Sequence, residues 1–268
     1  MGSNVVSTIK NRIYSDFLMS SRLEEYEQLL KFALERSYQT YTILQFWRMT
    51  EGGKKLPPGK FLLIRHDIDT DVATAQGMWE IENALRVKST YYFRLSTLDM
   101  QLMKQIEEAG SEASYHYEEL ATLCKHDRIR SAQEAQNRIQ DIRDMFTRNI
   151  AELRKNRGLP MKSVASHGDF MNRKLGVRNV VILQDMDFRK KVDIEVEAYD
   201  ELAMKFVESR HSDLGYPTFW KPSHPMAAMK NDTRVIYILV HPRHWKAAIK
   251  EHLVDDIQRL YAQIKYSI

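Results

Sequence analysis

Two aspartates, Asp67 and Asp69, stand just beyond the apolar run FLLI at residues 61–64, which has the composition of a buried parallel strand. Side chains alternate along a strand, so both carboxylates should leave its end on the same side. Two carboxylates placed in this way can form a metal site or a general-base site. The alternative is a solvated turn after a core strand, because Asp is a common turn residue.

Histidines stand at the ends of other predicted strands. These strands are residues 111–118 with His116, 162–169 with His167, and 234–240, which His241 follows. In a parallel sheet or barrel the carboxyl ends of the strands meet at one edge, where α/β-barrel enzymes have their catalytic residues. We therefore expect the three histidines to lie near Asp67 and Asp69.

Asp69, His116 and His167 would together supply two imidazoles and one carboxylate, with positions left open for water. This set suits a divalent ion, zinc first, with iron, cobalt or manganese as alternatives. Such an ion can activate water for attack on a carbonyl. Asp67 could take the proton of that water, and His241 could protonate the leaving group. These are the parts needed to hydrolyse an amide or an ester.

Strands alternating with helices along the chain predict an α/β fold with a parallel sheet, and the number of βα units favours a barrel. Helices are predicted at 15–48, 100–109, 131–156 and 245–264, and further strands at 88–95, 179–183 and 192–198. Pattern and length predict one domain, with a helical segment over 1–60, a core over 61–245 and a closing segment over 246–268.

The 268 residues are 43% hydrophobic and 28% charged, as in an ordinary soluble protein. A net charge of +4 is too small to indicate nucleic acid as a partner. The single cysteine, Cys124, excludes an intrachain disulfide. We see no signal peptide and no run long enough to span a membrane, so a cytoplasmic protein is expected. The oligomeric state is left open.

Five motifs in order resemble the polysaccharide deacetylase family, the NodB-like carbohydrate esterases. They are HDID at 66–69, STYYFR at 89–94, EASYHYEEL at 112–120, SHG at 166–168 and ILVHP at 238–242. The resemblance covers roughly residues 60 to 245. It implies a distorted (β/α)7 barrel and metal-dependent removal of an N- or O-acetyl group from a sugar.

Carried over by motif, the resemblance makes Asp67 the base, Asp69 and His116 metal ligands, and His241 the catalytic acid. The sequence departs from the family at two points. Ile68 separates two aspartates that are usually adjacent, and Leu120 stands where the second motif repeats its histidine. Leucine cannot bind a metal, so we expect the third ligand to be His167.

Asp213 and Trp220 resemble the family's fourth motif, which contains Asp and Trp, and Trp220 is a candidate substrate contact. Asp213 could orient His241 and raise its pKa, or it could be an ordinary turn residue. Arg65 and Arg94 also end predicted strands. Either could stabilise an oxyanion or hold an anionic substrate group, and a structural ion pair is the alternative for both.

The first hypothesis for function is a metal-dependent deacetylase of an acetylated sugar, expected to be an intracellular glycan precursor. The alternatives are a barrel of the same fold that binds a sugar or a protein without turnover, or a metal hydrolase of another C–N bond. Among the remaining histidines, His244 is a candidate contact in the site. His126 and His252 are predicted to be exposed.

Overall fold

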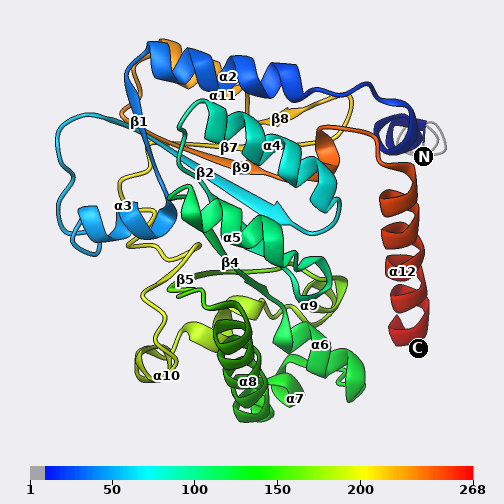
Figure 1. Cartoon of the computed structure of the whole chain (residues 1–268). Helices are drawn as coiled ribbons and strands as arrows, with labels where there is room; N and C mark the ends of the chain where they lie inside the picture. Colours follow the sequence, from blue (N-terminus) through cyan, green and yellow to red (C-terminus); the bar gives the residue numbers. More distant parts are fainter. Residues whose placement is uncertain (1–9, 268) are drawn as a thin grey trace.

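The computed structural model describes residues 10–267 and has an α/β fold with a largely parallel, mixed sheet of nine strands (Figure 1). The order along the sheet is β6-β5-β4-β3-β2-β9-β7-β8, and β1 pairs with β2 beside this path. The strands are β1 (Tyr38–Tyr41), β2 (Lys60–Ile68), β3 (Thr90–Phe93), β4 (Glu112–Tyr117), β5 (Ser163–Ser166), β6 (Val196–Glu197), β7 (Ser209–Asp213), β8 (Trp220–Lys221) and β9 (Val235–Val240). The pair β7–β8 is antiparallel and every other pair is parallel.

Strand β2 is the centre of the sheet and pairs with three neighbours. Residues 60–63 pair with β1, residues 65–68 with β3, and residues 61–66 with β9. Leu62 and Ile64 pack in one apolar cluster, while Phe61 and Leu63 pack in another on the opposite face. Burial on both faces explains why the strand reads as an unbroken apolar run.

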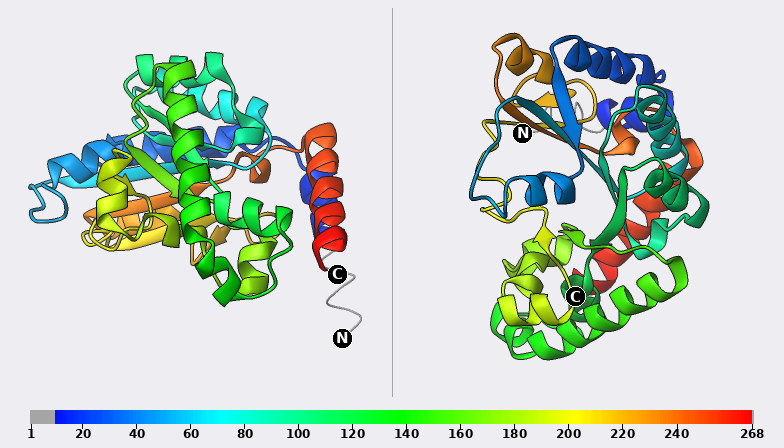
Figure 2. Two further views of the ribbon diagram at one scale, coloured as in Figure 1. Left: turned by 90° about the horizontal axis from the view of Figure 1, so that it is seen from below. Right: turned by 60° about the vertical axis from the view of Figure 1, so that its left-hand side comes forward.

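Most of the helices surround the sheet, while α12 stands at the side of the molecule, as the views from two further directions show (Figure 2). The longer ones are α2 (Leu23–Glu35), α4 (Val72–Ala84), α5 (Met100–Glu108), α6 (Glu119–His126), α8 (Ile139–Arg157) and α12 (Ile249–Ser267). The others are α3 (Ile43–Met49), α7 (Ala132–Asn137), α9 (Phe170–Leu175), α10 (Met186–Lys191), α11 (Pro225–Lys230) and the short helices η1 (Tyr14–Leu18), η2 (Leu95–Thr97), η3 (Asn179–Leu183) and η4 (Pro242–His244). Within residues 10–267, no helix has both the length and the hydropathy needed to cross a bilayer.

Several predicted elements differ from the structure. The helix predicted over 15–48 is wrong in its middle, because Ser37, with φ +62°, ends α2 and the chain continues into β1. Residues 179–183 form the 3₁₀ helix η3 instead of a strand, and the strand predicted over 192–198 is reduced to β6. The helix predicted over 131–156 is divided at Arg138 into α7 and α8.

Strand β7 was not predicted, because its sequence SRHSD is polar. It nevertheless pairs in parallel with β9 and buries His211 and Asp213. This pairing brings the end of β7 beside the end of β9. The position matters for the candidate site, because β9 is followed directly by His241.

Candidate functional site

The predicted site residues lie at the carboxyl ends of parallel strands, as expected. Asp67 and His116 are the last-but-one residues of β2 and β4, while His167 and His241 directly follow β5 and β9. Asp69 lies one residue beyond β2. These strands lie within the run β5-β4-β3-β2-β9 of the sheet, so residues from distant parts of the sequence meet at one edge.

Asp69 lies between two imidazoles. Its Oδ1 atom is 3.4 Å from Nε2 of His116 and 3.4 Å from Nε2 of His167. This oxygen is buried and has no hydrogen-bond partner among the described residues. Ligand atoms bound tetrahedrally to one zinc ion at about 2.0–2.1 Å stand roughly 3.3–3.4 Å apart, which these two distances match.

The partners of the other ring nitrogens fix the tautomers of both histidines. Nδ1 of His116 donates to the carbonyl oxygen of Ala165 over 2.9 Å, and a carbonyl can only accept. Nδ1 of His167 lies 2.9 Å from Oε2 of Glu118, to which it donates. Both Nε2 atoms therefore direct a lone pair toward the side of the unpaired carboxylate oxygen of Asp69. The carboxylate oxygen and the two Nε2 atoms are all acceptors, and together they could hold a divalent cation.

Glu118 orients His167 and is itself held by Arg94. The guanidinium Nη2 of Arg94 lies 3.1 and 2.9 Å from the two carboxylate oxygens of Glu118. Burial raises the pKa of Glu118, but the hydrogen bond from His167 and the charge of Arg94 outweigh burial and lower it to about 2. Arg94 thus forms the structural ion pair that was the alternative to a substrate contact, and it also lines the larger cavity described below.

Asp67 is held by Arg65 through two hydrogen bonds. Nε donates to Oδ1 over 2.6 Å and Nη2 donates to Oδ2 over 2.8 Å. Burial raises the pKa of Asp67, but the charge and hydrogen bond of Arg65, together with the charges of His116 and His241, outweigh burial and lower the pKa below its ordinary value. Arg65 is fully buried and its guanidinium lies 4.3 Å from the ring of Tyr199, so it positions Asp67 rather than meeting solvent. Oδ2 of Asp67 is 3.4 Å from Nε2 of His116.

His241, which is half-buried at a cavity, and the buried Asp213 form a hydrogen-bonded pair. Nδ1 of His241 donates to Oδ1 of Asp213 over 2.7 Å, and the backbone N–H of His241 donates to Oδ2 over 2.8 Å. The indole of Trp245 also donates to Oδ2, over 2.9 Å. Burial lowers the pKa of His241, but the charge of Asp213 and this hydrogen bond raise it to about 9. The orienting partner predicted for His241 is therefore present, and Nε2 of His241 is left to face the site.

A second histidine, His244, also faces this carboxylate, with its Nδ1 atom 3.2 Å from Oδ1 of Asp213. Ligand atoms of Asp213, His241 and His244 all lie within 4.8 Å of one another, so these residues could hold a metal ion. The ligand atoms of Asp69, His116 and His167 do not all lie within 4.8 Å of one another, although each Nε2 is 3.4 Å from Oδ1 of Asp69. An ion bound at Asp69 would therefore have to draw the two imidazoles together. However, the 2.7 Å contact of Asp213 with His241 is shorter than the roughly 3.3–3.4 Å between ligand atoms of one zinc ion, so a shared proton fits there better.

Two residues of the predicted motifs belong to the core. Trp220 is 5% exposed, packs against Trp245 with ring centroids 5.7 Å apart, and lines neither of the two cavities at the site. Its indole therefore packs behind Trp245, which donates to Asp213, and the predicted contact of Trp220 with a substrate is wrong. Leu120, at the position of the family's second histidine, is buried in the apolar cluster on the side of α6.

Sequence reasoning missed Glu118 and Trp245 as parts of the site. Glu118 lies inside the motif at 112–120, two residues after His116. An acidic residue this close to a predicted metal ligand could have indicated a carboxylate that orients a histidine. Trp245 gave no such indication, because an indole near the end of a strand is usually core. Its partner Asp213 lies 32 positions earlier in the sequence, so no local pattern indicates this contact.

Two cavities meet at Asp69 and Thr70. One, of about 580 Å³, is also lined by Asp67, His241 and His244. The other, of about 1030 Å³, is lined by His167 and by residues of α12. A substrate can therefore reach Asp69, Asp67 and His241 together. In comparisons with known proteins, no family model and no curated protein matches this chain.

Proposed function

We propose that the protein is a metal-dependent hydrolase that removes an acetyl group from a sugar, with zinc as its first candidate ion. The observation that carries the proposal is the buried, unpaired Oδ1 of Asp69 between the Nε2 atoms of His116 and His167. These three residues would hold the ion. When bound there, a divalent ion polarises a carbonyl and lowers the pKa of an attacking water.

Asp67 and His241 could act as a general base and a general acid. Asp67, kept ionised by Arg65, is suited to accept a proton from water at the cavity. His241, whose pKa of about 9 keeps it protonated at neutral pH, is suited to donate a proton to a leaving amine. Asp213 holds His241 in the orientation that directs its Nε2 away from the carboxylate.

The resemblance to polysaccharide deacetylases and the distorted (β/α)7 barrel belong to the same proposal. In support, seven strands follow one another in parallel pairing from β6 to β7. The ion-pair partner of Asp67 and the carboxylate partner of His241 support the roles that the resemblance implies for both residues. An acetylated glycan precursor, carried on a nucleotide or a lipid, is the proposed substrate.

The test combines metal content with turnover. We expect one zinc ion per chain by elemental analysis of protein prepared with zinc, and release of acetate from acetylated amino sugars or their nucleotide-linked forms. His167→Ala should lose both, while His126→Ala, the same change at an exposed imidazole outside the site, should lose neither.

Asp67→Asn separates catalysis from metal binding, because the amide can no longer accept a proton. It should keep the ion and lose about 10²–10⁴-fold in turnover, the usual scale for a general base. A zinc-loaded protein that releases no acetate from any of these sugars would refute the proposed activity and favour a sugar-binding barrel.

A further inference from the structure

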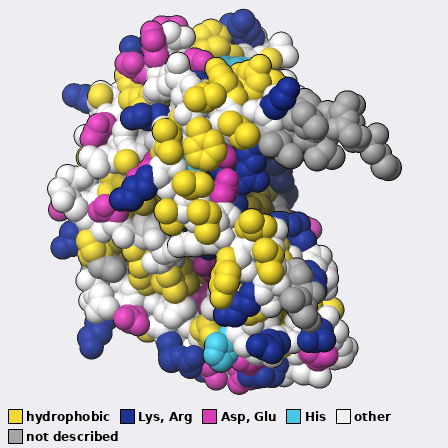
Figure 3. Space-filling view, turned by 90° about the vertical axis from the view of Figure 1, so that its right-hand side faces the viewer, with side chains coloured by type: hydrophobic (Ala, Val, Ile, Leu, Met, Phe, Trp, Pro, Cys, Tyr) yellow, Lys and Arg dark blue, Asp and Glu magenta, His cyan; other side chains and the backbone are white. Residues whose placement is uncertain are grey.

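The carboxyl-terminal helix α12 stands at the side of the molecule with its apolar face outward. Figure 1 shows it apart from the body of the fold, below η1. Among residues 249–266 only His252 is buried. Six aliphatic side chains of the helix are between 46% and 60% exposed: Ile249, Leu253, Val254, Ile257, Leu260 and Ile264. Figure 3 views the molecule from this side and shows hydrophobic side chains gathered along the middle of the face.

The opposite, polar side of α12 faces its own chain. His252, which was predicted to be exposed, has its Nδ1 atom 3.1 Å from the carbonyl oxygen of Asp16 on η1. Asp255 and Asp256 pair with Arg243 over 2.7 and 2.9 Å. The helix is therefore fixed to the fold through charged groups. Most stabilisation of a protein helix comes from packing of its apolar face, so a face left outward needs a partner.

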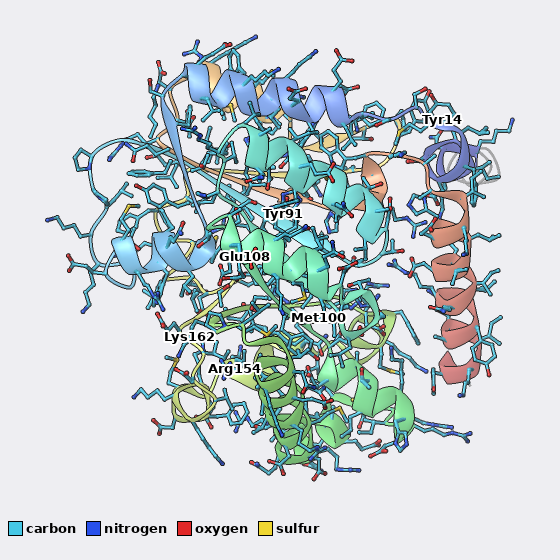
Figure 4. All side chains as sticks on the ribbon, viewed as in Figure 1. Tyr14, Tyr91, Met100, Glu108, Arg154 and Lys162 are labelled. Carbon is cyan, nitrogen blue, oxygen red and sulfur yellow. The ribbon has the colours of Figure 1, made fainter. Side chains whose placement is uncertain are left out.

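The spacing of the exposed side chains is that of a coiled-coil seam. Leu253, Ile257, Leu260 and Ile264 follow one another at intervals of four, three and four residues, the pattern of two helices packed along an apolar seam. Figure 4 shows the outer side chains of α12 projecting with no other element of residues 10–267 beyond them, and labels Tyr14 on η1 at the upper end of the helix. The seam thus has the form that a second helix would fill.

We propose that this seam binds α12 of a second copy of the chain, in antiparallel orientation. With a two-fold axis between Gln258 and Arg259, Leu253 meets Ile264 of the second copy, and Ile257 meets Leu260 of the second copy. The four seam positions therefore complement themselves under two-fold symmetry, which a dimer of identical surfaces requires.

The charges on α12 do not oppose a second copy. Asp255 and Asp256 are paired with Arg243 of their own chain, and Glu251 and Lys265 lie on the side of the helix away from the seam. No like charges therefore face one another across the seam. Three acidic and three basic residues, counting Lys250, give the helix no net charge. A helix that lies on an anionic membrane carries mainly basic residues on its polar face.

The oligomeric state of the full chain tests the proposal first. Light scattering after gel filtration, over a series of concentrations, should give twice the mass of one chain. Ile257→Asp with Leu260→Asp should halve that mass while circular dichroism stays unchanged, because two charges would be buried in the seam. Met186→Asp adds a charge at an equally exposed apolar residue, on α10 at a distance from α12, and should leave the dimer intact.

Cysteine cross-linking tests the register, and the buried Cys124 does not compete. Leu253→Cys and Ile264→Cys proteins, mixed and oxidised, should form a disulfide dimer. Either protein alone should not, since antiparallel pairing sets each residue about 16 Å from its own counterpart along the axis. Cross-linking of either variant alone would overturn the antiparallel arrangement.

A wild-type chain that is monomeric at every concentration would overturn the proposal as a whole. So would seam-dependent binding to vesicles of phosphatidylcholine and phosphatidylserine in the absence of a dimer, which would identify a membrane as the partner. The proposal does not depend on the proposed function, because neither measurement involves a metal or a substrate.

Discussion

Asp213→Asn should shift the proton equilibrium of His241 and leave the fold intact. Asparagine has the size of aspartate, and its carbonyl oxygen can still accept from the indole of Trp245. It lacks the charge that raises the pKa of His241 from 6.5 to about 9. A rise of this size corresponds to roughly 3 kcal/mol in favour of the protonated ring. Without the carboxylate, burial lowers the pKa of His241 while the charges of Asp69 and Asp67 still raise it, so the pKa should fall from about 9 toward 6.5.

The difference in the pKa of His241 should make the stability of the two proteins depend differently on pH. A histidine with a raised pKa stabilises the folded state below its unfolded pKa of 6.5, and the contribution is lost as the pH rises through about 9. The free energy of unfolding of the wild type minus that of Asp213→Asn should therefore be largest near pH 6. It should be smaller by roughly 3 kcal/mol near pH 10.

NMR titration of the imidazole resonances would measure the pKa directly, with the signal of His241 assigned from its absence in His241→Gln. Urea denaturation of both proteins at several pH values would give the free energies. A pKa of His241 that is the same in the wild type and in Asp213→Asn would refute the reasoning, because the proximity of the carboxylate would then have no effect on the ring.

Further predictions concern the groups around Asp69 and Asp67. Glu118→Gln removes the charge that orients His167, so zinc affinity, measured by competition with a chromophoric chelator, should fall about 10–100-fold. An unchanged affinity would show that His167 needs no such partner. Arg65→Met leaves the carboxylate of Asp67 buried without its cation, and the free energy of unfolding in urea should fall by about 3–5 kcal/mol. A denaturation midpoint equal to that of the wild type would contradict the account of this pair.

The strand ends that build the site could be predicted because their local sequences are unambiguous. Strand β2 is buried on both faces, so it reads as an apolar run whose end is marked by Asp67 and Asp69. The histidines that end β4, β5 and β9 were placed at the same edge by the parallel topology alone. The ion pairs of Arg65 and Arg94 were left open, because a sequence does not show which acid an arginine meets.

Other features could not be predicted because contacts distant in sequence determine them. Strand β7 is polar and owes its burial to β9, more than 20 residues later along the chain. His252 reads as an exposed helical residue, yet η1 and α4 cover it: Nε2 lies 3.6 Å from Oδ2 of Asp71. The outward apolar face of α12 has the periodicity of any amphipathic helix, and only the structure shows which way it points.

The central claim is that Asp69, His116 and His167 bind one divalent ion. Anomalous diffraction at the zinc absorption edge, from crystals grown with zinc, locates such an ion without reference to any substrate. We predict one strong peak at about 2.0–2.2 Å from a carboxylate oxygen of Asp69 and from Nε2 of both histidines. A peak among Asp213, His241 and His244 instead, or no peak at either group, would contradict the claim.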